Sequence, residues 1–316
     1  MEKICITGAN GFIGKSLCKA LNSSDKSIRG FVRTLDPNKN YTKIEYLSVG
    51  DISSKINWKD QLNGYDCIVH CAGRAHVMNK NEDLDVYHLV NTEGTRRLAE
   101  QAAAVGVKKF VYLSSVKVNG ESTGKIDNNK IFTNNDIPEP QDAYSISKFK
   151  AEKVLWEISA KTGLEVVIVR LPSVYGKDVK GNLARLIKLV KLGIPLPLSM
   201  VQNQRSMIGI DNLVDLIIKC IDHPVVSGKT FLVSDGEDLS TTDLINHIGI
   251  SMGRKARLFP VPIFLLKLLG SILGKQKEIN RLVGSLKIDS SYTQEILNWT
   301  PPVSVAEGIR RMVQDK

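Results

Sequence analysis

A tyrosine and a lysine lie four positions apart, at Tyr144 and Lys148. On a helix this spacing places both side chains on one face. A tyrosine hydroxyl has an unperturbed pKa near ~10, and a neighbouring cation lowers that pKa by favouring the phenolate. Upstream, Ser115 follows an apolar run and could polarise a substrate carbonyl. The three residues predict proton transfer at an alcohol or carbonyl, although a Tyr–Lys pair at this spacing is also common on ordinary amphipathic helices.

A glycine-rich loop lies at the start of the chain. Residues 7–14 read Thr-Gly-Ala-Asn-Gly-Phe-Ile-Gly, between an apolar strand-like run and a helical pattern. Glycines allow unusual backbone angles and let a pyrophosphate approach main-chain N–H groups at a helix N-terminus. The spacing and context predict a dinucleotide site. The contacts that we expect from this loop are Gly8, Asn10, Gly11, Phe12, Ile13 and Gly14.

The choice of coenzyme depends on the end of the second strand-like run. An NAD-binding fold usually has an acidic residue there, and this chain has Arg33. An arginine would attract the 2′-phosphate of NADP(H), which we favour, although Arg33 could also be a solvated loop residue, and NAD(H) stays possible. Asp51 and Ile52 are expected at the adenine. Small residues that would let the cofactor pass closely are Cys71, Ala72 and Gly73.

The composition excludes several other classes of function. The chain has 43 Lys+Arg against 33 Asp+Glu, a net charge of +10, but no run of five like charges. We therefore interpret the excess as a solvated basic surface in preference to one that attracts an anionic ligand, and we expect no nucleic acid partner. The five cysteines show no CxxC spacing, and the five histidines no paired ligand spacing. These patterns predict free thiols in a reducing compartment and no metal site.

The N-terminus lacks the apolar segment and cleavage site of a signal peptide, so we expect a cytoplasmic protein. The most apolar stretch is residues 260–274, which includes Lys267. It is shorter than the ~20 residues that a membrane span needs. We expect a packed helix here in preference to a helix on a membrane surface, and no stable membrane insertion.

The elements that must position these residues alternate along the chain. Short apolar runs predict strands at residues 4–7, 28–32, 46–49, 67–70, 110–113 and 166–169. Helical periodicity lies between them, at residues 12–21, 91–105 and 144–161. This alternation is typical of βαβ units that form a parallel sheet.

The chain as a whole is predicted to be an α/β protein. Residues 1–171 should form a Rossmann-type, doubly wound parallel sheet that carries the cofactor site and the Ser, Tyr and Lys. After Pro172 the pattern loosens into a loop and a cationic helical segment at residues 182–192. Residues 172–316 should form a smaller substrate-binding lobe. Another strand-like run at residues 230–234 indicates that this lobe is partly interwoven with the first domain.

The glycine loop, Ser115, Tyr144 and Lys148 together resemble the extended short-chain dehydrogenase/reductases. Within them the chain is similar, over essentially its whole length, to the NAD-dependent epimerase/dehydratase family typified by UDP-glucose 4-epimerase. The resemblance implies an enzyme that moves a hydride between a nicotinamide and C4 of a UDP-sugar while Tyr144 exchanges the proton. It also implies a homodimer through the helices at residues 91–105 and 144–161.

The resemblance implies further site residues. Asn91 matches the family's Asn before the fourth helix, and Leu171 is expected at the cofactor. Arg205 matches the arginine that binds the substrate diphosphate, and Asn182 starts the helix that flanks the uridine. The full set expected at the substrate is Arg74, Ser115, Lys117, Ser173, Asn182 and Arg205.

One branch of the family is more similar still. The runs at residues 73–78, 116–121 and 235–241 resemble reductases of UDP-4-keto-6-deoxy-N-acetylglucosamine, which serve surface-polysaccharide synthesis. Two departures from the wider family are Ser173, for the usual Asn, and Asn119, for the usual Tyr. Val116 and Lys117 replace the Asp-Glu pair of related dehydratases, so we expect no dehydratase activity.

We therefore expect net reduction of a 4-keto sugar. The alternatives are a UDP-glucose or UDP-N-acetylglucosamine 4-epimerase and, from another class, a nucleotide-binding regulator without catalysis, since a fold does not prove chemistry.

Overall fold

The computed structural model describes residues 2–36, 44–53, 55–74, 84–124 and 130–314. Positions 75–78 of one run noted above lie outside the described residues. Within the described part, a sheet of seven parallel strands has the order β3-β2-β1-β4-β5-β6-β9. The strands are β1 Lys3–Thr7, β2 Ser27–Val32, β3 Glu45–Ser48, β4 Cys67–His70, β5 Lys109–Ser115, β6 Glu165–Leu171 and β9 Lys229–Leu232.

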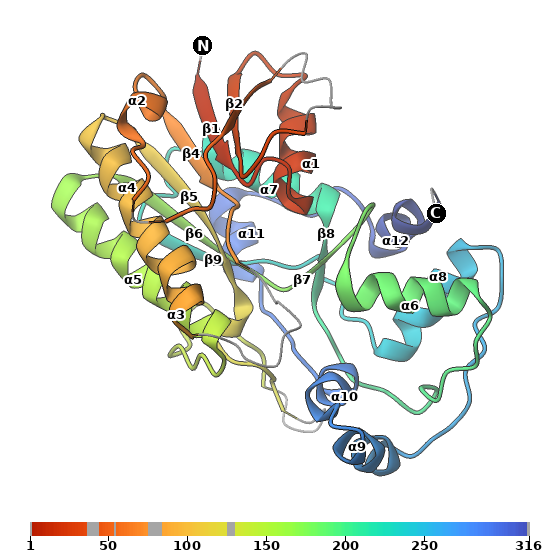
Figure 1. Cartoon of the computed structure of the whole chain (residues 1–316). Helices are drawn as coiled ribbons and strands as arrows, with labels where there is room; N and C mark the ends of the chain where they lie inside the picture. Colours follow the sequence, from red (N-terminus) through yellow and green to blue (C-terminus); the bar gives the residue numbers. More distant parts are fainter. Residues whose placement is uncertain (1, 37–43, 54, 75–83, 125–129, 315–316) are drawn as a thin grey trace.

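Helices cover both faces of this sheet, as Figure 1 shows. One face packs against α1 (Phe12–Leu21) and α7 (Ile210–Asp222). The other packs against α4 (Gly94–Ala104) and α5 (Ala143–Thr162). The strand order reverses between β1 and β4, and ligands of open parallel sheets bind at such a reversal, beyond the carboxyl ends of the strands.

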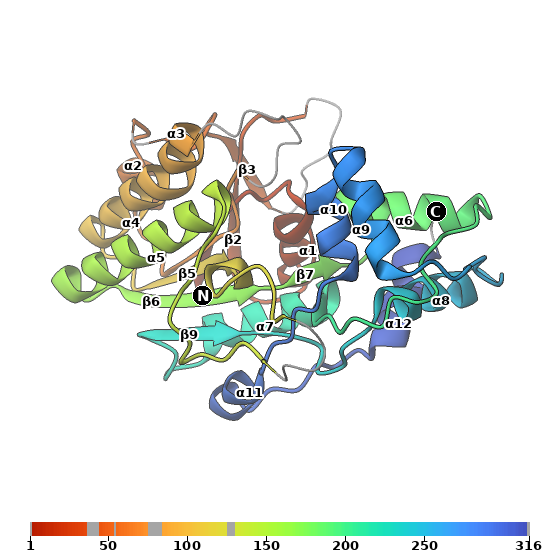
Figure 2. The same cartoon turned by 90° about the horizontal axis from the view of Figure 1, so that it is seen from below.

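A smaller lobe lies beside the carboxyl ends of the strands (Figures 1 and 2). Its two-stranded parallel sheet pairs β7 with β8. Its own apolar core lies mainly among α6, α8 and α12. The elements are β7 Ser173–Tyr175, α6 Gly181–Lys191, β8 Met207–Gly209, α8 Thr241–Ser251, α9 Ile263–Ile272, α10 Gln276–Val283 and α12 Val305–Val313. The division of the chain at residue 171 stays a prediction.

The remaining elements are short. A 3-10 turn, η2 (Val116–Val118), follows β5, and α11 (Ser291–Leu297) packs beside β9. The others are α2 Lys59–Leu62, α3 Leu84–Tyr87 and the π-helix η1 His88–Glu93.

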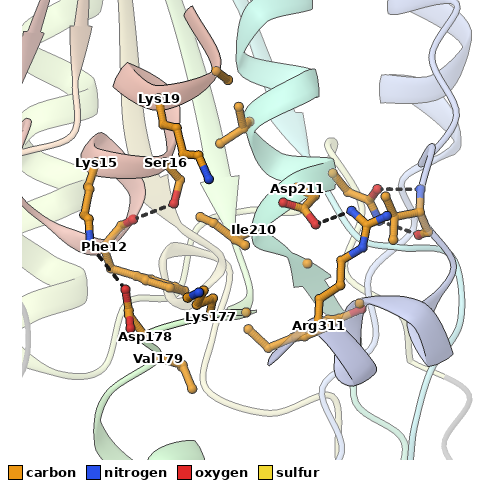
Figure 3. A pocket seen from close by; sticks show the side chains of 18 of the residues that line it. Phe12, Lys15, Ser16, Lys19, Lys177, Asp178, Val179, Ile210, Asp211 and Arg311 are labelled. Carbon is orange, nitrogen blue, oxygen red and sulfur yellow. Dashed lines mark hydrogen bonds and ion pairs between the residues drawn. The ribbon is translucent and has the colours of Figure 1, made fainter. Parts of the chain in front are cut away.

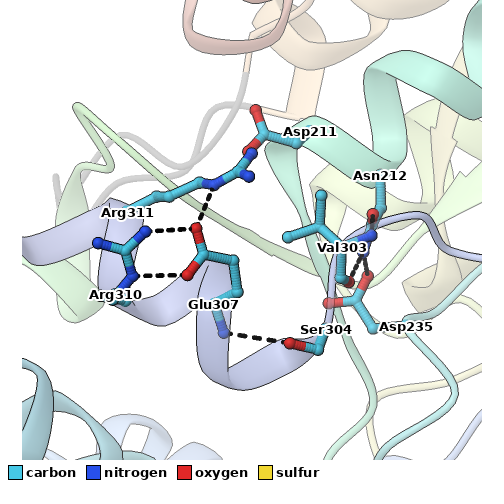
Figure 4. Close-up of polar contacts among 8 residues, drawn as sticks. All are labelled: Asp211, Asn212, Asp235, Val303, Ser304, Glu307, Arg310 and Arg311. Carbon is cyan, nitrogen blue, oxygen red and sulfur yellow. Dashed lines mark hydrogen bonds and ion pairs between the residues drawn. The ribbon is translucent and has the colours of Figure 1, made fainter.

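A polar network fastens α12 to α7 (Figure 4). Asn212 donates to the carboxylate of Asp235 at 2.7 Å and to the carbonyl of Val303 at 2.8 Å. At the surface, Arg311 donates to Asp211 at 2.8 Å. Asp235 also accepts from the hydroxyl of Tyr175 at 2.7 Å, so this residue of the 235–241 run braces β7 and α7 against each other.

The sequence predicted most of these elements. The strand positions are confirmed within one or two residues, and the helix at residues 12–21 is confirmed at both ends. The helix predicted at 91–105 begins instead as a π-helix. The apolar stretch at residues 260–274 forms a helix, α9, that packs through one narrow side only. Only Leu266 and Gly270 of α9 are buried, so hydropathy identified the helix but misjudged what covers it.

Candidate active site

The loop between β1 and α1 depends on two glycines. Gly8 has a φ of +67°, and a Cβ there would lie 2.9 Å from the backbone of Ala72. A Cβ on Gly14 would lie 2.2 Å from the carbonyl oxygen of Gly8. Side chains at either position would push the loop away from β4 or from α1. The glycine spacing therefore sets a tight passage beside Cys71 and Ala72.

The same loop leaves the start of α1 open. Gly11 is extended, with φ −73° and ψ 174°, and no described side chain caps the first helical turn. Uncapped N–H groups at a helix N-terminus favour a bound anion. Phe12 and Ile13 lie in that turn and are partly buried, while Asn10 is exposed. The residues present fit the diphosphate of a dinucleotide.

Arg33 and Asp51 contact each other beyond β2 and β3. The Nε of Arg33 lies 2.7 Å from a carboxylate oxygen of Asp51, and the two side chains are 74% and 75% exposed. Sequence reasoning assigned them separately, Arg33 to a 2′-phosphate and Asp51 to the adenine. Ile52, also expected at the cofactor, packs close to Gly94 at the start of α4.

Ser115 ends β5 and Tyr144 lies in the first turn of α5. Burial raises the pKa of Tyr144 to about 12, while a hydrogen bond with the Ser115 side chain acts in the other direction. The charges of the Asp142 carboxylate and of the Tyr87 hydroxyl group raise the pKa further. The expected lowering of this pKa is therefore not what the described residues produce, and the phenol is protonated at neutral pH.

Lys148 lies one turn further along α5 and is buried. Its Nζ donates to the carbonyl of Leu113 at 2.8 Å and lies 4.6 Å from the ring centre of Tyr112. A Cβ on Gly73 would come within 3.2 Å of this nitrogen. Burial lowers the pKa of Lys148 to about 8, against the opposing charge of Glu152. The ammonium thus lies against a glycine where a cofactor could pass.

Asn91 is buried within the π-helix and holds two segments together. Its amide nitrogen donates to the carbonyl of Arg74 at 3.1 Å and to the hydroxyl of Ser147 at 2.9 Å. Its amide oxygen accepts from the Arg74 backbone N–H at 2.7 Å. Ser147 lies between Tyr144 and Lys148 on α5, so Asn91 connects the catalytic helix to the segment that follows Gly73.

His70, to which sequence reasoning gave no role, is buried between the glycine loop and the Asn91 helix. His70 Nδ1 lies 2.6 Å from the hydroxyl of Thr7, and its Nε2 lies 3.0 Å from the hydroxyl of Thr95. Burial lowers the pKa of His70 to about 3, so the ring is neutral at physiological pH. Thr95 donates onward to the carbonyl of Asn91 at 2.7 Å. The glycine loop and the Asn91 helix are therefore joined through one imidazole.

A buried ion pair joins Glu152 of α5 to Arg170 of β6, and sequence reasoning did not identify it. Glu152, one turn after Lys148, accepts from Arg170 at 3.1 and 2.6 Å and from the hydroxyl of Ser114 at 2.5 Å. The remaining arm of Arg170 donates to Asn119 at 3.0 Å. Asn119, one of the two departures from the family, is thus committed to the protein interior. The i, i+4, i+8 spacing of Tyr144, Lys148 and Glu152 was the available signal.

A large cleft lies to one side of these residues. It has a volume of about 1380 Å³ and extends from the glycine loop along α1, α7 and α12 (Figure 3). Its walls carry the ion pair of Lys15 with Asp178, at 3.3 Å, and that of Arg311 with Asp211. Ser115, Tyr144 and Lys148 do not line it. The candidate active site therefore rests on the hydrogen bonds and side-chain chemistry around α5, and not on this cleft.

The described residues contain no group of three or more His, Cys, Asp or Glu that could hold an ion. The five cysteines are free, and burial raises the thiol pKa values of Cys5, Cys18, Cys67, Cys71 and Cys220. In the same part of the chain, no helix is long and apolar enough to cross a membrane.

Comparison with known proteins settles the family. Residues 4–234 match the NAD dependent epimerase/dehydratase family. The chain belongs to this family. A UDP-glucose 4-epimerase of Vibrio cholerae is 42% identical over 317 residues, which cover 99% of this chain and 95% of that protein. An N-acetyl-alpha-D-glucosaminyl-diphospho-ditrans,octacis-undecaprenol 4-epimerase of Escherichia coli is 24% identical, over 99% and 95% of the two chains.

Solved structures of the epimerase/dehydratase family share the fold. A UDP-glucuronic acid 4-epimerase from Bacillus cereus, in complex with NAD, superposes with a TM-score of 0.79 at 20% identity, covering 99% of this chain and 97% of that one. A UDP-N-acetylglucosamine 4-epimerase from the same species gives the same TM-score at 21% identity. Through the family that residues 4–234 match and the 42% identical relative, the chain is an enzyme of the NAD-dependent, extended short-chain dehydrogenase/reductase type.

Two cations expected at the substrate, Lys117 and Arg205, contact other groups of the protein. The ammonium of Lys117 contacts the carboxylates of Asp142 and Glu121 at 2.5 and 2.9 Å. Arg205 donates to the backbone carbonyls of Arg281 and Gly284 at 3.0 and 2.9 Å. Both cations therefore have protein partners, and their contact with a substrate stays a prediction.

Four other expected residues differ in burial and in their contacts. Leu171 is buried and pairs in register with Ser115, while Ser173 and Asn182 are exposed at the starts of β7 and α6. The guanidinium of Arg74 lies 5.9 Å from the ring centre of Tyr87. That ring packs edge-on to Tyr144 at a centroid distance of 6.3 Å, a support that sequence reasoning did not identify.

Proposed function

We propose that this enzyme is a UDP-sugar 4-epimerase. The observation that carries the proposal is the shared hydrogen bond of Ser115 and Tyr144, one helical turn from the buried Lys148. The relative from Vibrio cholerae supports the choice of reaction, because its likeness spans 99% of this chain. These residues argue against a regulator without catalysis.

The side chains have distinct roles in this reaction. Ser115 and Tyr144 would both contact the C4 oxygen. For the hydroxyl to be oxidised, Tyr144 must first lose its own proton; its phenolate then takes the proton from the hydroxyl, and the phenol returns it as the ketone is reduced. Lys148 keeps a positive charge beside the cofactor passage at Gly73. Asn91 holds α5 in place through Ser147. When bound, the nicotinamide supplies the hydride acceptor and donor.

We propose NAD(H) as the coenzyme rather than NADP(H). Arg33, the reason for expecting a 2′-phosphate, already contacts the carboxylate of Asp51. An exposed ion pair of this kind contributes only about 0–1 kcal/mol, so it does not fix Arg33 in place. The carboxylate would nevertheless repel a phosphate and could accept from ribose hydroxyls. The NAD-bound structural neighbours are consistent with this choice.

Reduction of a 4-keto sugar is the second candidate. It is favoured by the protonated Tyr144, the form that a reduction consumes, whose pKa lies near 12. Val116 and Lys117 follow Ser115 and include no carboxylic acid, so this enzyme should not make a 4-keto-6-deoxy sugar by itself. The substrate of such a reductase would be UDP-4-keto-6-deoxy-N-acetylglucosamine, delivered by a separate dehydratase.

One pair of incubations separates the two reactions. UDP-glucose and UDP-N-acetylglucosamine are supplied separately with NAD⁺ and no reductant, and UDP-4-keto-6-deoxy-N-acetylglucosamine is supplied with NADH or NADPH. A C4 epimer formed without net change in coenzyme absorbance supports the proposal. Stoichiometric loss of reduced coenzyme, with no epimer in the first incubations, would establish the reductase instead.

A homodimer through α4 and α5 is part of the proposal. These helices lie side by side on one face of the sheet (Figure 1). They can therefore form one continuous surface, as the dimer interface implied by the family resemblance needs. Sedimentation at increasing protein concentration tests this assembly.

A further inference from the structure

Helix α9 turns an apolar stripe outward. Leu265, Leu268, Leu269 and Ile272 follow the i, i+3, i+4, i+7 spacing of a single helix face. In a soluble protein such a face normally packs against the core. Here the four side chains are 38%, 54%, 52% and 72% exposed.

The opposite side of α9 provides its attachment to the protein. Leu266 is buried, and a Cβ on Gly270 would lie 2.7 Å from the side chain of Ile279 in α10. Figure 1 shows α9 at the outer edge of the lobe, beside α10. The helix is therefore already packed through its narrow side, and the stripe is a second, separate face. Phe264, within α9, and Leu273, at its C-terminal end, are further exposed apolar side chains.

The segment of the chain that carries this stripe is basic. Residues 254–281 contain seven basic side chains and a single acidic one, Glu278, so this segment holds +6 of the net +10 of the chain. Lys267 lies within α9, and Lys275 and Lys277 are exposed where α10 begins. Exposed apolar side chains among basic ones are suited to bind a lipid bilayer, whose interior is apolar and whose headgroups can be anionic.

The charge also decides between two occupants. A second copy bound through this face in a twofold dimer would place the same basic segment against itself. A bilayer with anionic headgroups has no such repulsion. A helix needs ~20 residues to span a membrane, and α9 has ten. It can therefore only lie along the interface between the bilayer and water.

We propose that α9 and α10 dock this enzyme on the surface of an anionic membrane. The docking surface, Ile263–Ile272 with its basic neighbours at Lys275 and Lys277, is firmly connected to the rest of the lobe. Arg205 donates to the carbonyls of Arg281 and Gly284, which close α10. Docking therefore acts beside the segment where the family resemblance places substrate binding, and it does not depend on which C4 reaction the enzyme performs.

The test is flotation of the full chain with lipid vesicles. One set is phosphatidylglycerol and phosphatidylcholine in equal parts, and the other is phosphatidylcholine alone. The variants are L268S with I272S, to remove apolar surface, and Lys275→Glu with Lys277→Glu, to reverse charge. Val225→Ser, which changes an equally exposed side chain after α7, is the matched control.

We expect the wild type and the Val225→Ser control to bind the anionic vesicles. Each double variant should bind at least about tenfold more weakly, with unchanged turnover of a soluble substrate. High salt should weaken binding as well. Equal binding by all variants overturns the proposal. So does an absence of vesicle binding, or a protein dimer that the apolar variant alone disrupts.

Discussion

Replacing Glu152 by alanine should strongly destabilise the folded enzyme. Glu152 and Arg170 are both buried, and the carboxylate accepts three hydrogen bonds, two from Arg170 and one from Ser114. Removing one partner of a buried ion pair costs about 3–5 kcal/mol, because the other charge is left uncompensated. At about 2 °C per kcal/mol for a chain of this size, the melting midpoint should fall by roughly 6–10 °C.

The assay is thermal and urea unfolding followed by circular dichroism. Glu307→Ala is the matched control, since Glu307 also accepts three hydrogen bonds from arginines but lies at the surface, and it should leave the midpoint nearly unchanged. The double variant Glu152→Leu with Arg170→Met should recover much of the lost stability. A Glu152→Ala midpoint equal to that of the control would refute the reasoning.

Three further predictions concern the active site directly. Tyr144→Phe should lower turnover by roughly 10²–10⁴-fold with coenzyme affinity unchanged, as steady-state kinetics and coenzyme titration can determine. Activity should decline as pH rises through about 8, where Lys148 loses its proton, and Lys148→Arg should move that decline to higher pH. Since this pKa lies below the ordinary 10.5, the buried ammonium opposes folding below about pH 8, and stability should rise between about 8 and 10.5 while activity falls; parallel pH profiles of the two quantities would contradict the assignment. Asp51→Asn should release Arg33 and shift the ratio of NADP(H) to NAD(H) affinity about tenfold towards NADP(H); an unchanged ratio would place both side chains outside the coenzyme site.

Local patterns predicted the sheet and the glycine loop because both are written in consecutive residues. Gly8 and Gly14 are explained by contacts within a few residues or with the neighbouring strand. The partners of Lys117 and Arg205 could not be predicted in the same way. Lys117 meets Asp142 across 25 residues, and Arg205 meets carbonyls about 80 residues away. The residue types identify a cation at each position, but only the tertiary structure shows which groups of the protein contact it.

Helix α9 illustrates the opposite difficulty. The periodicity at Leu265, Leu268 and Ile272 correctly predicts one apolar face, and burial of that face was the natural expectation. The structure instead uses Leu266 and Gly270 for packing. Hydropathy reports that a face avoids water, and it does not report whether another part of the same chain covers it.

The π-helix His88–Glu93 makes chain length itself a functional variable. A π turn holds one residue more than the α turn that it replaces, so deleting a residue here would let an ordinary helix run through from Leu84 to Ala104. Because both kinds of turn complete one revolution, this deletion would leave the residues before it facing the same way relative to α4. If the same residues continued instead as an uninterrupted α-helix, the extra residue would rotate everything before it by about 100° relative to α4. Tyr87 would then move away from Tyr144, so the π turn is what allows the extra residue without the loss of this contact.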